Sequence, residues 1–184
     1  MKAWKNNISQ ISGKKLKERD SYNRSKFTGL TGYIFRQDDE RIKDLKYGRF
    51  FKVGENGCGV VAAYNVMTEL GKPVDFCDVL LEFELNKLGR VNGLLGTSPR
   101  RLPNYFKAHG IECEVINDFE EYRRRANEFK ISIIFIREKK SLVEHYFCVL
   151  KRGEGDFVTL NQYYSNSFGK LTWDNHFKTA YCFK

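Results

Sequence analysis

Hydrophobic residues recur with a helical period in the first half of the chain and in shorter, strand-like patterns in the second half. Apolar positions three or four residues apart predict helices over about 55–71, 76–88 and 99–109. Later segments alternate between apolar and polar residues or are continuously apolar, as strands are, and cover 111–116, 131–136, 144–151, 156–161 and 180–183. A charged helix is also predicted over 119–129, and a short strand over 47–53.

Helices that are followed mainly by strands are typical of an α+β domain. Residues 152–155, Arg-Gly-Glu-Gly, separate two strand segments and predict a hairpin, which favours an antiparallel sheet. The helix at 55–71 is apolar on nearly every side and is therefore expected to be buried. We expect N-terminal helices, this buried one among them, packed on a C-terminal antiparallel sheet.

Cys58 lies at the start of the predicted buried helix. A thiol in the first helical turn faces unsatisfied backbone N–H groups and the positive end of the helix dipole, and both favour the thiolate. Gly57 and Gly59 carry no side chains, so we expect a substrate backbone to approach the sulfur closely. Cys58 is therefore the candidate nucleophile.

The composition fits one globular domain with a basic leading segment. The chain has 184 residues, of which 41% are hydrophobic and 15% aromatic. Its net charge of +9 is concentrated at the start, where the first 30 residues hold eight basic and two acidic side chains. We expect residues 1–28 to be weakly ordered and residues 29–184 to form the domain. No recognisable nucleic-acid motif accompanies the charge, so nucleic acid is not expected as a partner.

The sequence has no apolar run near the roughly 20 residues of a membrane span, and its start lacks the apolar region of a secretory signal. A cytoplasmic location is expected. The five cysteines include no C-x-x-C pair, which disfavours both a disulfide framework and a zinc ribbon. We therefore expect reduced thiols, no metal and no cofactor, while the oligomeric state leaves no signal in the sequence.

A cysteine nucleophile needs a base, and His145 is the best placed of three histidines. It begins an apolar strand, where an imidazole can face a helix N-terminus, whereas His109 ends a predicted helix and His176 lies in a polar turn. Asn161 follows His145 by sixteen residues, at the far end of the predicted hairpin, so the two ends are neighbours. Its amide oxygen is expected to orient the imidazole. Asp156 is the competing orienter, but it lies at the turn.

Cysteine at a buried helix N-terminus, histidine leading a strand and asparagine after a hairpin, in this order, resemble the papain-like cysteine peptidases. The resemblance covers about residues 47–183 and is strongest for the compact branch similar to bacteriocin-leader-processing peptidase domains. It implies a papain-like fold in which Cys58 is the nucleophile, His145 the acid and base, and Asn161 the orienter. It also implies an acyl-enzyme on sulfur.

The family usually places a glutamine six residues before the cysteine, where it binds the oxyanion of the intermediate, but this chain has Lys52 there. Three residues are candidates for the missing donor or for substrate contact. Lys52 itself offers an ammonium, Asn56 offers an amide from closer to the cysteine, and Gln37 offers one from an upstream loop. Losing one oxyanion donor lowers the rate on the order of 100- to 1000-fold.

The function predicted from the sequence is a thiol hydrolase that cleaves peptide or amide bonds through a Cys-His-Asn triad. One alternative is an acyltransferase or transpeptidase on the same fold, which uses the same kind of triad. The other is a catalytically silent papain-like domain that binds a peptide, because Lys52 replaces the glutamine.

Overall fold

The computed structural model describes residues 13–48, 50–90, 96–137, 144–162 and 176–184. The helices are α1 (Gly13–Lys26), α2 (Val53–Asn56), α3 (Cys58–Glu69), α4 (Phe76–Leu85), α5 (Leu102–Ala108) and α6 (Phe119–Arg125), which continues into the 3-10 turn η2 (Ala126–Glu128). The strands are β1 (Lys46–Tyr47), β2 (Phe51–Lys52), β3 (Glu114–Ile116), β4 (Ile131–Arg137), β5 (Glu144–Gly153), β6 (Asp156–Leu160) and β7 (Phe177–Phe183).

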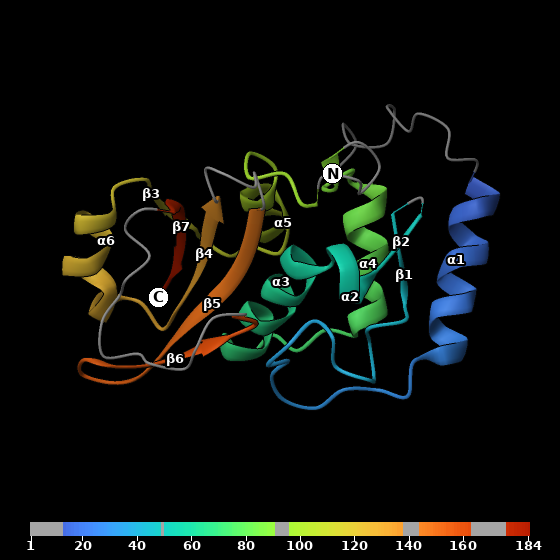
Figure 1. Ribbon diagram of the computed structural model, residues 1–184, viewed down its shortest axis with the longest axis horizontal. Coiled ribbons are helices and arrows are strands. Elements are labelled where there is room, and N and C mark those ends of the chain that lie inside the picture. Colours follow the sequence, from blue (N-terminus) through green and yellow to red (C-terminus); the bar gives the residue numbers. More distant parts are fainter. Residues whose placement is uncertain (1–12, 49, 91–95, 138–143, 163–175) are drawn as a thin grey trace.

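A five-stranded antiparallel sheet forms the C-terminal half of the fold. Its strand order is β3-β7-β4-β5-β6, and Ile133 of β4 pairs with Cys148 on one side and Tyr181 on the other. Helices α1 to α5 lie to one side of this sheet and α6 lies to the other, as Figure 1 shows. The expected α+β class, with N-terminal helices packed on a C-terminal antiparallel sheet, is confirmed.

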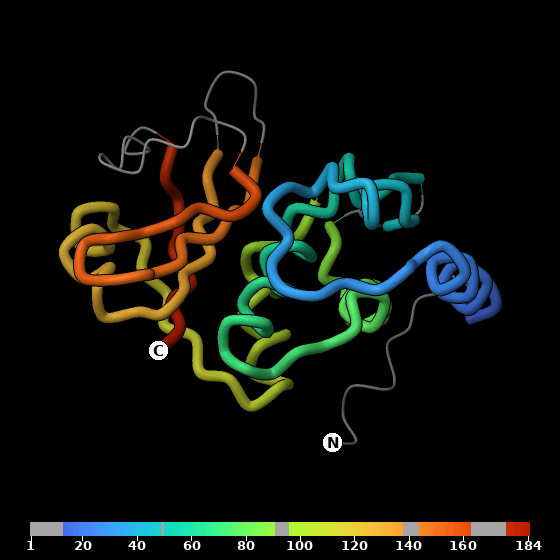
Figure 2. Tube along the Cα trace, turned by 90° about the horizontal axis from the view of Figure 1, so that it is seen from below, coloured from blue at the N-terminus to red at the C-terminus, as the bar shows by residue number. Residues whose placement is uncertain are grey.

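The central strands β4 and β5 are buried on both faces of the sheet. On β5, Tyr146, Cys148 and Leu150 join the core that contains α3, while Phe147 and Val149 join a second core under α6. The view from below in Figure 2 shows these layers from a second direction. Burial on both faces explains why β4 is apolar from Ile131 to Ile136, apart from Ser132, instead of alternating.

Helix α3 is the central element between the helical half and the sheet. All of its residues from Cys58 to Met67 are buried, as its apolar sequence predicts. The helix is followed by Gly71 with a φ of +65°, a left-handed conformation that glycine adopts without strain. Asn65, fully buried within α3, binds the backbone of Ile34 through both ends of its amide, at 2.8 and 2.9 Å. The upstream loop is thereby fixed to the helix.

Part of the leading segment that we expected to be weakly ordered forms helix α1. The Asn23 side chain donates to and accepts from the backbone of Lys46, at 2.9 and 2.8 Å, and Arg19 pairs with Glu84 of α4 at 3.1 Å. Residues 1–12 lie outside the described residues. The division at residue 28 stays a prediction.

Several predicted elements differ in their bounds, and the helix expected over 55–71 is divided into α2 and α3 at Gly57. The strand expected over 47–53 is a hairpin of β1 and β2, because Gly48 adopts a φ of +65° and turns the chain back so that Lys46 pairs with Lys52. The helix expected from 99 begins at Leu102, and the helix expected over 119–129 ends as α6 at Arg125 and tightens into η2. The Asp118 cap of α6 accepts a hydrogen bond from the Glu121 backbone at 2.7 Å.

The buried Glu84 carboxyl should make the stability of the protein depend on pH. Burial outweighs the attraction of Arg19 and raises the pKa of Glu84 from 4.5 to about 7. Folding therefore favours the protonated acid, so its contribution is complete below pH 4.5 and is lost as the pH rises through about 7. Since one pKa unit corresponds to about 1.4 kcal/mol, we expect the free energy of unfolding to fall by about 3 kcal/mol over this range.

Urea denaturation between pH 4 and 8 checks this prediction. The variant Glu84→Gln should flatten the profile, whereas Glu120→Gln, at an exposed position on α6, should leave it unchanged. An equal slope in wild type and Glu84→Gln would contradict the assignment.

Candidate active site

Cys58 is the first residue of α3, and its thiol lies against the sheet. The backbone N–H groups of Tyr146, Gly59 and Cys58 itself all point toward the sulfur. Tyr146 directly follows His145 on β5, so α3 packs against the strand that carries the predicted base. Only 7% of Cys58 is exposed.

The glycines beside Cys58 make room for protein atoms, which differs from the expectation that a substrate would fill this space. A Cβ on Gly57 would lie 2.6 Å from the Val53 carbonyl oxygen, and one on Gly59 would lie 2.1 Å from Oγ1 of Thr97. The close packing of Val53 and Thr97 therefore requires glycine at both positions. A substrate must reach the sulfur from another direction.

His145 is held by Asn161, but through a different atom from the one we predicted. Nε2 of the imidazole lies 2.5 Å from the main-chain carbonyl oxygen of Asn161. The ring also stacks on Phe147, with centroids 6.4 Å apart and an interplanar angle of 17°. A neutral imidazole that donates from Nε2 to the carbonyl keeps Nδ1 as its basic nitrogen.

The Asn161 side chain points to the upstream loop instead of to the imidazole. Its Oδ1 accepts from the backbone N–H of Gln37 at 2.7 Å, and its Nδ2 donates to the Tyr146 carbonyl at 3.2 Å. The residue is buried and has a φ of +65°, which asparagine tolerates better than most residues. Asn161 thus orients His145 with its main chain and fixes the surrounding loop with its side chain.

The three oxyanion candidates occupy different environments. Lys52 forms an exposed ion pair with Asp44 at 2.7 Å, which directs its ammonium to the surface. Gln37 is buried, and its Nε2 donates to the Gly54 carbonyl at 2.9 Å. Asn56 is half-buried at the end of α2, two residues before Cys58. Of these, Gln37 and Asn56 lie near the start of α3, and Lys52 points away from the site.

Burial changes the expected charge states of the candidate nucleophile and the candidate base. Burial raises the pKa of the Cys58 thiol. This effect is larger than that of the nearby N–H groups and of Arg90, which lower the pKa. Burial also lowers the pKa of His145. At neutral pH the pair is therefore a thiol and a neutral imidazole, instead of the thiolate expected from the helix terminus, because desolvation disfavours both charges.

The sequence reasoning missed an ion pair beside the site. Arg90 and Glu144 form a salt bridge, and Glu144 also lies 3.4 Å from Arg137. Glu144 immediately precedes His145, and the Arg90 charge acts on Cys58. Arg90 and Glu144 are 54 residues apart, so no local pattern in the sequence links them.

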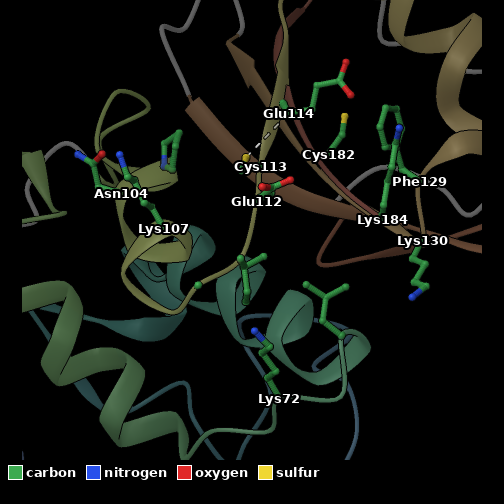
Figure 3. A pocket seen from close by; sticks show the side chains of 14 residues that line it. Lys72, Asn104, Lys107, Glu112, Cys113, Glu114, Phe129, Lys130, Cys182 and Lys184 are labelled. Atoms are coloured by element: carbon green, nitrogen blue, oxygen red, sulfur yellow. Dashed lines mark hydrogen bonds between the residues drawn. The ribbon is translucent and has the colours of Figure 1, made fainter.

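A large cleft lies at the opposite end of α3 from Cys58. Figure 3 shows its lining side chains, which include Lys72, Lys107 and Lys130, and its volume is about 810 Å³. Leu70, at the end of α3, also lines it. Twelve helical residues span about 18 Å, so this cleft is separate from the thiol.

No known family model matches the chain, and no curated protein matches it in sequence. Among the described residues, no helix is both long and apolar enough to cross a bilayer. The same part of the chain contains no group of three His, Cys, Asp or Glu side chains arranged to hold a metal ion. The case for a function therefore depends on the geometry around Cys58.

Replacing Gly59 with alanine should destabilise the protein by about 2 kcal/mol. Alanine normally stabilises a helix relative to glycine by about 1 kcal/mol, but here its Cβ would overlap Thr97, which is fully buried. Gly153→Ala is the matched control, because its Cβ would have no neighbour closer than 3.7 Å. Thermal denaturation of both variants checks the prediction, and a stabilised Gly59→Ala would contradict the packing.

Alkylation of Cys58 by iodoacetamide should be slow at pH 7 and rise about tenfold per pH unit up to pH 9. Only the thiolate reacts, and the raised pKa of Cys58 keeps its population small in this range. Peptide mass spectrometry identifies the labelled residue, with the half-buried Cys113, whose pKa is raised to about 12, as the internal reference. Fast, pH-independent labelling of Cys58 down to pH 5 would show an ion pair and contradict the neutral state.

Proposed function

We propose that this protein is a thiol hydrolase with a papain-like fold, which cleaves peptide or amide bonds through Cys58, His145 and Asn161. The observation that carries the proposal is the contact between the Cys58 thiol and the main chain next to His145. The hydrogen bond between His145 and Asn161 supports it, because an oriented imidazole is what a general base requires.

The neutral pair supports a general-base mechanism. Nδ1 of His145 accepts the thiol proton as the sulfur attacks the substrate carbonyl carbon, and the carbonyl electron pair moves to oxygen. The tetrahedral intermediate then collapses, the carbon–nitrogen bond breaks, and the leaving amine takes the proton from the imidazolium. The remaining acyl-enzyme is released by water, or by an amine if the protein acts as a transferase.

Specific observations also favour one second candidate, a catalytically silent domain that binds a peptide. Cys58 is 93% buried, and the residue at the usual oxyanion position, Lys52, points to the surface. A buried thiol without an oxyanion donor would have little activity. Peptide cleavage that depends on Cys58 is the property that separates the hydrolase from this candidate.

The hydrolase proposal predicts Cys58-dependent cleavage of a quenched fluorescent peptide library at pH 7.5 under reducing conditions. We expect Cys58→Ala to lower the cleavage rate at least 1000-fold, because no other group supplies the nucleophile. Cys113→Ala is the matched control and should keep the wild-type rate, since this cysteine lines the lysine-lined cleft, which does not include Cys58.

Equal rates in wild type and Cys58→Ala would reject the hydrolase and favour the silent domain. Adding glycinamide as an acyl acceptor separates hydrolysis from transfer. A transferase would give the amide product, detected by mass, whereas a hydrolase would give mainly the free acid.

A further inference from the structure

The cleft at the C-terminal end of α3 is separate from the proposed catalytic residues, and Cys58, His145 and Asn161 do not line it. Its walls are the loop after α3, helix α5, the segment 110–114 and the adjoining ends of β4 and β7. Its volume of about 810 Å³ lies in the range of about 300–1,000 Å³ that is typical of small-molecule sites. The cleft is therefore large enough for a ligand of its own.

Lysines outnumber the acidic side chains that line this cleft. Arg125 donates hydrogen bonds to both carboxylate oxygens of Glu114, which neutralises that charge. Glu112 is then the one remaining carboxylate of the lining, and no residue that the structure describes forms an ion pair with it. It faces the ammonium groups of Lys72, Lys107, Lys130 and Lys184. The excess of positive charge favours an anionic ligand.

The four ammonium groups differ in how they are held. Nζ of Lys72 donates to the His109 carbonyl at 3.3 Å, and Nζ of Lys184 lies 3.8 Å from the Glu128 carboxylate. Lys107 and Lys130 are exposed, and within the described part of the chain neither has an acidic partner. Figure 3 shows these two lysines on opposite sides of the cleft, with Glu112 and Lys72 between them. A ligand in the cleft would thus meet cations on both sides.

The cleft also has apolar surface. Leu70 and Ile111 are partly buried and pack against the main core, and Pro103 of α5 lies among the other lining residues. An apolar surface with a few charged groups around it is the usual composition of a site for organic ligands. A bare inorganic anion would leave this apolar surface in water.

We propose that this cleft binds a small organic anion, which carries two or more phosphate or carboxylate groups on an apolar body. The ammonium group of lysine is a compact point charge and pairs with either kind of anionic group. Glu112 would accept a hydrogen bond from a hydroxyl or amino group of such a ligand. This site is independent of the proposed hydrolase function, because it shares no residue with it.

Titration calorimetry of the full chain at low ionic strength tests the inference, with ATP in the absence of magnesium as the organic phosphate and trimesate as the organic carboxylate. We expect saturable binding of one of them that weakens as salt is added. The double variant Lys107→Glu/Lys130→Glu should lower the affinity about tenfold or more, because two ion pairs are lost.

The variant Lys14→Glu/Lys17→Glu is the matched control. It changes the net charge by the same amount at exposed positions of α1, outside the cleft, and should keep the wild-type affinity. An equal loss in both double variants would show attraction to the net charge alone and would overturn the inference.

Lysine acetylation by sulfosuccinimidyl acetate, read by peptide mass spectrometry, locates the ligand on the wild-type protein. The bound probe should protect Lys107 and Lys130 at least threefold and leave Lys14 and Lys17 unprotected. Equal protection of all four would overturn the cleft as the site, and this measurement decides the question if a variant does not fold.

The remaining outcomes concern the kind of ligand and the relation to catalysis. Inorganic tripolyphosphate should bind more weakly than ATP, and equal affinity would overturn the role of the apolar surface. No saturable binding of ATP or trimesate below about 1 mM would overturn the site itself. Cys58→Ala should bind the probe as the wild type does, so an inactive hydrolase leaves the anion site standing and a failed anion site leaves the hydrolase standing.

Discussion

The packing of α3 against β5 positions the whole candidate site. Ala62 is small enough for the helix backbone to approach the strand closely, so that the Cys148 thiol lies 3.5 Å from the Ala62 carbonyl oxygen. This contact, one turn along the helix from Cys58, sets how near the thiol comes to the backbone of Tyr146. The apolar surface that drives this packing therefore also sets the geometry of the candidate site.

The same burial that assembles the site suppresses its charges. A helix N-terminus stabilises an anion by only about 0.3–2 kcal/mol, whereas removing a charge from water costs more than this unless a partner compensates. The raised pKa of Cys58 and the lowered pKa of His145 show that desolvation is the larger effect here. The proposed mechanism accordingly begins with a neutral pair and separates charge only during the reaction.

Buried amides join the upstream loop to the elements that carry the site. Asn65 binds the backbone of Ile34 from α3, and Asn161 binds the backbone of Gln37 from the end of β6. Gln37 in turn donates to Gly54 in α2. A loop that precedes the helix by some twenty residues is thus tied to both the helix and the sheet, and it holds Asn161 where its carbonyl meets His145.

The sequence by itself determined the features that depend on near neighbours. Periodicity indicated the buried helix and the strands, the capping residue Asp118 marked the start of α6, and the Gly155 turn marked the hairpin, because helix ends and turns are decided within a few residues. It also placed His145 and Asn161 in contact, because a hairpin with a short turn fixes which ends meet. Only the tertiary structure decided which Asn161 atom holds the imidazole, where Lys52 points, and that Thr97 packs against Gly59, the residue after Cys58. These features depend on segments that are far apart in the chain. Their relative position is set by the packing of whole helices on the sheet, which is favoured because it removes apolar surface from water.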